Sequence, residues 1–253
     1  MEHDKRQIIA ASDGPPPPRR FRPSLWSSAL VALLIVAFVS LGNWQLQRAR
    51  EKRDLLDAFD SGSAIPAARA AATANAANQY PRYTPLSARG QFDTRHQFLL
   101  DNVVQHGQVG FYVWTPLRLE GSNAAILINR GWFPLGPTRG DIPPIEVDER
   151  PREISGLLDR LPEPGLRLSG SGLSAEWPRV AVYPRIDELR AVLDYPLYDY
   201  LLLLDAGADD GFVRDWRPQL LPPRRHVGYA VQWFAFATAV LALFLILSFK
   251  RES

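Results

Sequence analysis

His226 is the residue of this sequence that is most strongly indicated as a ligand-binding group. It follows Arg224 and Arg225, and an apolar run that reaches almost to the last residue begins directly after it. In a helix, Tyr229 and Trp233 would share a face with His226, because they follow it by three and seven positions. A neutral imidazole can ligate a metal through one ring nitrogen. The plainer interpretation is a polar residue at a helix start, beside aromatic rings of a membrane boundary.

The rest of the sequence offers few groups for catalysis. It contains no cysteine, which excludes disulfides, thiolate catalysis and cysteine-based zinc or iron–sulfur sites, and Met1 is its single methionine. The motifs Gly-x-Ser-x-Gly, Gly-x-x-x-x-Gly-Lys, His-Glu-x-x-His, Gly-x-Gly-x-x-Gly and Cys-x-x-Cys-His are all absent. His96 and His106 stand in polar, turn-like segments, which predicts ordinary surface residues. A hydrolase would need a nucleophile and a base that the fold brings together.

Two apolar runs are long enough to cross a lipid bilayer. Residues 227–249 carry no charge and are closed by Lys250 and Arg251, and residues 25–44 are also uncharged. A helix rises about 1.5 Å per residue, so the second run spans roughly 34 Å, against about 30 Å for a hydrocarbon core. The first run is longer than the apolar part of a signal peptide, and no small-x-small cleavage site follows it. The sequence therefore predicts two membrane helices with both termini on one side.

Charge alone does not decide which side that is. On the side of the two termini, five Lys or Arg residues precede the first span and two follow the second. On the side of the loop, four follow the first span and four precede the second. Long loops also cross largely regardless of charge. The net charge of +2 is scattered, so nothing indicates nucleic-acid binding, and the juxtamembrane arginines are expected to meet lipid headgroups. Acidic residues in the N-terminal tail argue against a mitochondrial transit peptide and favour a bacterial inner-membrane protein.

The segment between the spans is predicted to be rich in β-structure. In residues 109–119, aromatic and β-branched side chains alternate between the two faces of an expected strand. A turn at 120–123 leads to a second apolar run at 124–129, so the two runs are predicted to form a hairpin. Further expected elements are strands at 152–158, 200–205 and 211–216, the last two as a hairpin, and an amphipathic helix at 186–193. Short strands separated by Pro and Gly are typical of an antiparallel barrel or sandwich.

The predicted fold class is a membrane protein in which a two-helix transmembrane hairpin flanks a mainly antiparallel β domain, barrel- or sandwich-like, with a few short helices. Gln45 and Gln232 are predicted to pair across the hairpin, because polar amides seek partners at membrane depth. The expected segments are a disordered tail at 1–24, a first transmembrane helix at 25–46, a juxtamembrane helix and Ala-rich linker at 47–82, a β-rich extramembrane domain at 83–222, a second transmembrane helix at 227–249 and a C-terminal tail at 250–253.

Four stretches carry a family resemblance when they are taken together and in this order. They read LGNWQLQRAREKRDLL at 41–56, GFYVWTPLRLEGSNAAILINRGWFP at 110–134, REISGLLDRLPEP at 152–164 and PRRHVGYAVQWF at 223–234. On a two-span hairpin, this set resembles the Surfeit-locus (Surf/Shy) family of cytochrome c oxidase assembly factors.

The resemblance implies a membrane assembly factor rather than an enzyme. Such a protein assists the insertion of haem a into the large subunit of haem-copper oxidase, with both termini cytoplasmic and the large domain in the periplasm of a bacterial inner membrane. Implied partners are the oxidase large subunit, the haem a synthesis machinery and the lipid bilayer. A scaffold that binds oxidase subunits without touching haem is the main alternative, and a membrane-anchored hydrolase is a further one.

The resemblance also assigns residues. The haem-associated histidine of the family corresponds to His226, and its Asn-Arg-Gly-Trp motif corresponds to residues 129–132. The pair Val227-Gly228 departs from the family, which often has bulkier residues there. Within the motif, Gly131 is predicted to end a strand in a tight bend that any side chain would obstruct.

The expected cofactor site is built around the start of the second span. His226 would ligate the iron of haem a, with Tyr229 and Trp233 beside the macrocycle. Arg224 and Arg225 would reach the haem propionates, because guanidinium groups match carboxylates. The apolar tail of haem a would lie in the lipid.

Overall fold

A computed structural model describes residues 19–64, 70–138, 141–142, 144–162, 173–209 and 212–251. Of the predicted tail at 1–24, only residues 19–24 fall within these ranges. The chain divides into two compact units, of which the first holds the described residues up to Arg53 and those from Leu220 onward, and the second is Asp54–Gln219.

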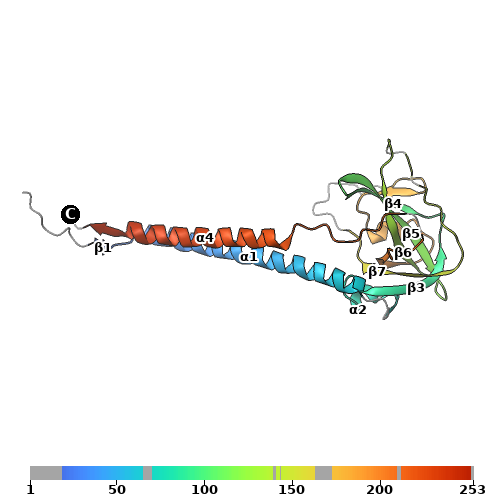
Figure 1. The fold of residues 1–253 in the computed structure, drawn as a ribbon, viewed down its shortest axis with the longest axis horizontal. Coiled ribbons are helices and arrows are strands. Elements are labelled where there is room, and N and C mark those ends of the chain that lie inside the picture. Colours follow the sequence, from blue (N-terminus) through green and yellow to red (C-terminus); the bar gives the residue numbers. More distant parts are fainter. Residues whose placement is uncertain are drawn as a thin grey trace, which may run out of the picture. The chain divides into compact units, whose positions relative to one another are not determined.

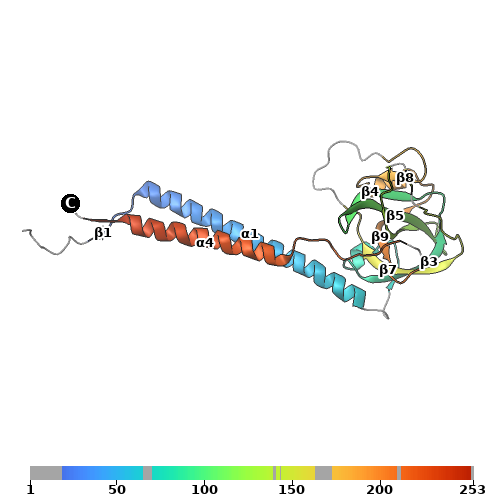
Figure 2. The same cartoon turned by 45° about the horizontal axis from the view of Figure 1, so that its top comes forward.

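The first unit holds most of one long helix and all of another. Helix α1 (Leu25–Ala64) and helix α4 (Pro223–Ser248) are each long and apolar enough to cross a membrane, and α4 lies along the first part of α1 (Figures 1 and 2). As predicted, α1 continues without a break through residues 45–59. α4 begins at Pro223, whose missing N–H suits a first helical turn. Strands β1 (Arg19–Phe21) and β10 (Phe249–Arg251) pair antiparallel, just before the start of α1 and just after the end of α4.

Small residues allow these two helices to approach closely. A Cβ added to Gly42 would lie 2.5 Å from the ring of Phe234, so any larger residue there would require the ring to move. Ala230 is fully buried, and Phe38 stacks on Trp233 with 5.7 Å between ring centroids. Close packing of this kind holds helices together in lipid, where the hydrophobic effect does not act between them.

The second unit is built on an eight-stranded sheet that closes into a barrel. The strand order is β2-β3-β7-β9-β6-β5-β4-β8, and β3 also pairs with β5, which closes a ring of five strands (Figure 2). The strands are β2 (Ala70–Ala71), β3 (Pro85–Phe92), β4 (Phe98–Gln105), β5 (Gln108–Leu119), β6 (Ala125–Pro134), β7 (Arg152–Asp159), β8 (Arg179–Ala181) and β9 (Leu197–Leu204). Two short helices, α2 (Ala76–Gln79) and α3 (Ile186–Arg190), accompany them.

Most of these elements confirm the expected fold class. The barrel is mainly antiparallel, the predicted hairpin is formed by β5 and β6, and α3 is the predicted amphipathic helix with Leu189 buried. Three pairings are parallel, namely β2 with β3, β4 with β8 and β6 with β9. Strands β3 and β4 were not among the predicted elements.

Strand β9 is buried on both of its faces. Tyr200 and Leu202 lie in one core cluster, whereas Leu201 and Leu203 lie in another. A strand covered on both sides needs an unbroken apolar run rather than an alternating one. This explains why the sequence from 200 to 204 reads Tyr-Leu-Leu-Leu-Leu.

The prediction of a strand at 211–216 is wrong. Within the described part of this segment, pairing is limited to an isolated bridge between Val213 and Trp132. The predicted hairpin with 200–205 is wrong for the same reason, because both edges of β9 are already occupied. β6 pairs along one edge and β7 along the other.

Gly131 lies inside β6 and not at the end of a strand as predicted. Asn129 and Gly131 face consecutive residues of β5, so Arg130 is the extra residue of a β-bulge. Gly131 has a φ of +142°, and a Cβ added there would lie 2.4 Å from the Cβ of Phe212. The predicted obstruction is therefore confirmed, and its cause is the bulge together with the close approach of Phe212.

Replacing Gly131 should destabilise the β domain. We expect Gly131→Ala to lower the free energy of unfolding by about 2–4 kcal/mol, from an unfavourable φ and from overpacking against Phe212. Gly121→Ala is the matched control, because Gly121 has a φ of +76° with no atom within 4 Å of an added Cβ. Gly121→Ala should lower the free energy of unfolding only through the unfavourable φ, by about 1–2 kcal/mol. Chemical denaturation of the full chain in detergent measures both losses, and equal losses would contradict the role of Phe212.

Candidate functional site

The side chain of His226 is held by a residue of the other long helix. His226 is the fourth residue of α4, and its Nδ1 lies 2.8 Å from Oε1 of Gln45 on α1. An amide oxygen can only accept, so Nδ1 carries the hydrogen and donates it. In the neutral imidazole, the lone pair is then on Nε2. That atom is buried and has no hydrogen-bond partner among the described residues.

This arrangement is the one that a metal-ligating histidine adopts. One ring nitrogen donates to an oxygen acceptor, which fixes the ring orientation and leaves the other nitrogen with its lone pair. A buried acceptor without a partner costs about 1–3 kcal/mol, so Nε2 is an unusual group for a helix contact. The residues present therefore fit a metal that takes one imidazole ligand from the protein.

The predicted pairing of Gln45 with Gln232 is wrong. Gln232 is exposed and follows His226 by six residues on α4. At about 100° per residue, it points about 120° away from His226 around the helix axis. His226, and not Gln232, therefore meets Gln45.

The other predicted site residues divide between the inside and the outside of the helix pair. Trp233 lies in the contact with α1, because it stacks on Phe38. Tyr229 is 51% exposed, and Arg224 and Arg225 are exposed in the first turn of α4. The structure thus brings His226 and Trp233 to the side that faces α1 and leaves the other three on the surface of this unit.

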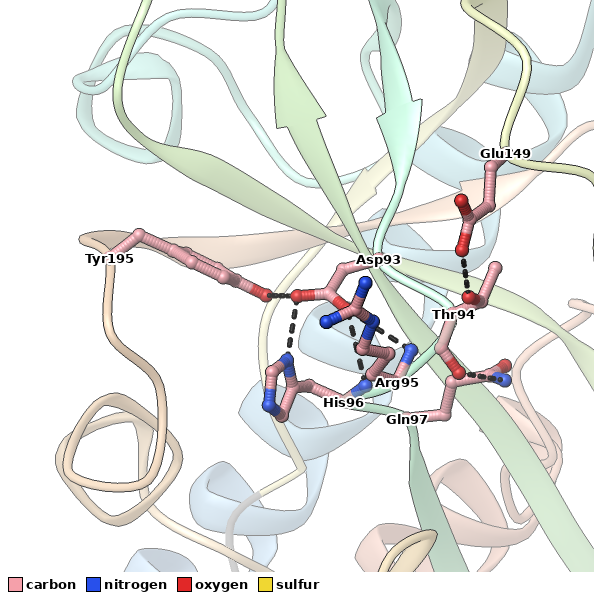
Figure 3. Close-up of polar contacts among 7 residues, drawn as sticks. All are labelled: Asp93, Thr94, Arg95, His96, Gln97, Glu149 and Tyr195. Carbon is pink, nitrogen blue, oxygen red and sulfur yellow. Dashed lines mark hydrogen bonds and ion pairs between the residues drawn. The ribbon is translucent and has the colours of Figure 1, made fainter.

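A second histidine is ordered within the β domain (Figure 3). His96 lies in the loop between β3 and β4, and its Nδ1 is 2.8 Å from Oδ2 of Asp93. The hydroxyl of Tyr195 donates to the same oxygen at 2.8 Å. The other oxygen of Asp93 accepts from the backbone N–H groups of Arg95 and His96. His96 was expected to be an ordinary surface residue, yet its side chain is only 30% exposed and is held by a carboxylate.

The electrostatics of this cluster are set by Asp93. Burial alone would raise the pKa of Asp93, but the hydrogen bonds from His96 and Tyr195 outweigh it and hold the pKa below its usual value. Burial, and then the hydrogen bond to the Asp93 carboxylate, raises the pKa of the Tyr195 hydroxyl. Asp93 is therefore a charged acceptor that orders both neighbouring side chains.

The cluster contains an orienting carboxylate and an imidazole, two parts of a general-base arrangement. Tyr195, however, donates to Asp93 and not to the imidazole. The ring of His96 packs edge-on against Trp177, with 4.8 Å between ring centroids. Among the described residues, no hydroxyl group is hydrogen-bonded to the His96 ring, so the visible effect of the cluster is to tie the loop at 93–97 to the segment before β9.

A buried arginine ties the same loop to the barrel. Arg130, the bulge residue of β6, is 1% exposed and donates to Oε1 of Gln97 at 3.0 Å. It also donates to the backbone carbonyls of Ile145 and Glu146, at 2.6 Å and 3.1 Å. One guanidinium thus links two loops to β6. A lysine could not do this, because it lacks the planar fork of donors.

Sequence reasoning did not find the roles of Gln45, Asp93, Tyr195 and Arg130. Two signals were present, since Asp93 precedes His96 by three residues and Arg130 stands in the Asn-Arg-Gly-Trp motif. Tyr195 gave no signal, because it is about a hundred positions from Asp93 in the chain and only the fold brings them together.

Comparison with known proteins decides the family. The sequence model of the SURF1 family matches residues 32–238, which include most of both long helices, the whole β domain and His226. The chain belongs to the SURF1 family. The resemblance drawn from the four sequence stretches is thereby confirmed. The SURF1 family is known in general for oxidase assembly factors.

Two curated SURF1-like proteins extend the likeness over nearly the whole chain. The protein of Rickettsia felis is 26% identical over 230 residues, which cover 87% of this chain and 96% of that protein. The protein of Rickettsia conorii is 24% identical over 224 residues, which cover 86% of this chain and 89% of that protein. The likeness to SURF1-like proteins therefore includes the helices and the β domain together.

The Asp93 cluster should make the stability of this SURF1-family domain depend on acid. A carboxyl whose pKa is lowered by folding stabilises the fold above its unfolded pKa of about 3.9, and this contribution is lost as the pH falls through the lower folded value. At pH 7, Asp93→Asn should lower the free energy of unfolding by about 1.5–3 kcal/mol, because the hydrogen bonds lose a charged acceptor.

The loss caused by Asp93→Asn should shrink as the pH falls below about 4. Denaturation curves of both proteins between pH 7 and pH 3 measure it. Asp199→Asn is the control, because Asp199 is exposed on β9 and should give little change at any pH. A loss for Asp93→Asn that is the same at pH 3 as at pH 7 would show that the carboxylate charge does not matter.

Proposed function

We propose that this protein assists the delivery or insertion of haem a into the large catalytic subunit of haem-copper cytochrome c oxidase, and that His226 would hold the haem iron. One observation carries the proposal. In a chain of the SURF1 family, a histidine at the start of a membrane-type helix has Nδ1 engaged by Gln45 and Nε2 without a protein partner.

A single imidazole suits a haem better than a bare metal ion. A haem macrocycle supplies four nitrogen ligands itself and needs only axial ligands from the protein. A bare ion needs several protein ligands, and the described residues contain no group of three or more His, Cys, Asp or Glu that could hold one. When bound, haem a would supply the iron and the redox chemistry, while His226 would hold and orient it.

The arginines beside His226 favour an anionic group at the same place. Arg224 and Arg225 lie in the first turn of α4, which contains no acidic residue. Positive side chains at a helix N-terminus oppose the helix dipole, so this turn is a favourable place for an anion. Haem propionates are carboxylates that guanidinium groups bind in a bidentate manner.

Tyr229 and Trp233 would contribute unequally to haem binding. Tyr229 is exposed and can contact a macrocycle without rearrangement of the helix pair. Trp233 is stacked on Phe38 and would have to leave that contact. Because Nε2 of His226 is itself buried, iron reaches it only when the side chains around it move. Such a site suits transient carriage rather than permanent storage.

In this proposal the protein is a multi-pass protein of a bacterial inner membrane, with both termini cytoplasmic and the β domain in the periplasm. Two helices of membrane-spanning length support the membrane association. The expected partners are the oxidase large subunit, the haem a synthesis machinery and the lipid bilayer.

The second candidate is a scaffold that binds oxidase subunits and never touches haem. The burial of Nε2 favours it, because a histidine covered by protein atoms can simply join two helices. The two functions differ in one measurable property. Protein purified from cells that make haem a shows a Soret band if it carries haem and none if it is a scaffold.

Removal of His226 should abolish haem binding without unfolding the protein. We expect His226→Ala to lose the Soret band or to shift it strongly, because an axial bond to iron is lost. Membrane insertion should persist, because an interhelical hydrogen bond in a membrane contributes only about 0.6 kcal/mol on average. His106→Ala is the control, because His106 is an exposed histidine of the β domain and should leave the spectrum unchanged. A wild-type spectrum in His226→Ala would refute ligation at this residue.

Removal of the neighbouring arginines should weaken haem retention without erasing it. Arg224→Ala and Arg225→Ala each remove one propionate partner, and each should speed haem loss to an acceptor such as apomyoglobin while the Soret position stays the same. Arg118→Ala, at an exposed arginine of β5, is the control. If the rates of haem loss equal that of the wild type, the arginines serve lipid headgroups instead.

A further inference from the structure

The hydrogen bond between Gln45 and His226 does more than join two helices. We propose that Gln45 is a positioning residue which selects the tautomer of His226, so that Nε2 keeps the lone pair needed to ligate a metal. This inference rests on the proposed function of His226 and extends it to a residue on the other helix.

The argument begins with the chemistry of a neutral imidazole. In water, a histidine side chain carries its single hydrogen mostly on Nε2, and that nitrogen then has no lone pair to give. A hydrogen-bond acceptor facing Nδ1 reverses the preference. The Oε1 atom of Gln45 is such an acceptor, at 2.8 Å from Nδ1.

The surroundings strengthen this selection. The amide oxygen of Gln45 is the partner that the packed helix pair offers to Nδ1. Nε2 is buried and has no protein partner among the described residues, which means that no group there favours a hydrogen on Nε2. Both ring nitrogens therefore favour the same tautomer.

Helix packing fixes the distance over which Gln45 acts. Gly42 lies one turn before Gln45 on α1, and its lack of a side chain allows the ring of Phe234 to approach. One turn further, Phe38 stacks on Trp233. These contacts hold the backbone of α1 close to α4, so that the amide of Gln45 meets the imidazole of His226 in one orientation.

The nature of the acceptor also matters. A glutamine oxygen fixes the tautomer without placing a charge inside the helix pair, whereas a carboxylate would fix it and also make the imidazole a stronger electron donor. This difference gives a readout that a purely structural role of Gln45 would not produce. With Glu at position 45, haem binding should persist, and the reduction potential of the iron should fall because the oxidised form is favoured.

The test uses the full chain in detergent micelles, with ferric haem titrated into haem-free protein. Gln45→Leu keeps the size of the side chain and removes the acceptor, and it should weaken haem affinity by about 10- to 100-fold. Gln45→Glu should restore the affinity. Gln232→Leu is the matched control, because Gln232 is an exposed glutamine of α4 and should bind haem as the wild type does.

A second measurement needs no haem. Nitrogen-15 NMR of histidine-labelled, haem-free protein distinguishes a ring nitrogen that carries a hydrogen from one that does not, and His226→Ala assigns the signal. The wild type should carry the hydrogen on Nδ1 of His226, and Gln45→Leu should move it largely to Nε2. If Gln45→Leu does not insert into membranes, the wild-type tautomer and the Gln45→Glu variant still decide the matter.

The outcomes separate the two proposals. A wild-type protein that binds haem, together with a Gln45→Leu protein that binds it equally well, overturns the role of Gln45 and leaves the proposed function intact. A wild-type His226 with its hydrogen on Nε2 also overturns the role of Gln45. A wild-type protein that binds no haem overturns the proposed function, and the positioning role falls with it.

Discussion

A polar side chain between two packed helices needs a hydrogen-bond partner within the pair wherever packing covers its polar atoms. In the first unit of this protein, that constraint joins His226 to Gln45. Once these two residues face each other in antiparallel helices, the positions one and two turns away are fixed as well. Gly42 then meets Phe234, and Phe38 then meets Trp233. The alignment of the two helices and the orientation of the imidazole thus follow from one hydrogen bond and the packing that accompanies it.

The two ordered histidines show how different surroundings suit different acceptors. His96 donates to the carboxylate of Asp93, whose charge is also stabilised by two backbone N–H groups and the hydroxyl of Tyr195. His226 donates to the neutral amide oxygen of Gln45, in a part-buried contact between two helices. Both imidazoles keep a free nitrogen, but only that of His226 is buried without a partner. The helix pair is therefore the place where a ligand of the imidazole would gain most.

The parts of the fold that were predicted correctly are those whose signal is local. The hairpin of β5 and β6 needs only two alternating runs and a turn between them, and all three can be read from residues 109–129. The segment at 211–216 looked similar by composition, yet its described residues, 212–216, form no strand. Whether this segment can pair with β9 depends on β6 and β7, which already occupy both edges of β9. No local sequence pattern indicates which strand edges are occupied. Strand formation at that place is thus a property of the whole sheet.

The same distinction applies to the candidate site. His226 could be singled out from its position alone, and Gln45 was recognised as a polar group in need of a partner. The choice of Gln232 as that partner failed because it ignored which face of α4 turns toward α1. Buried Ala230 and stacked Trp233 lie four and seven residues after His226, so all three share the face that meets α1. A small residue one turn after a polar one is what a close helix contact requires, and this pattern points to His226 rather than Gln232.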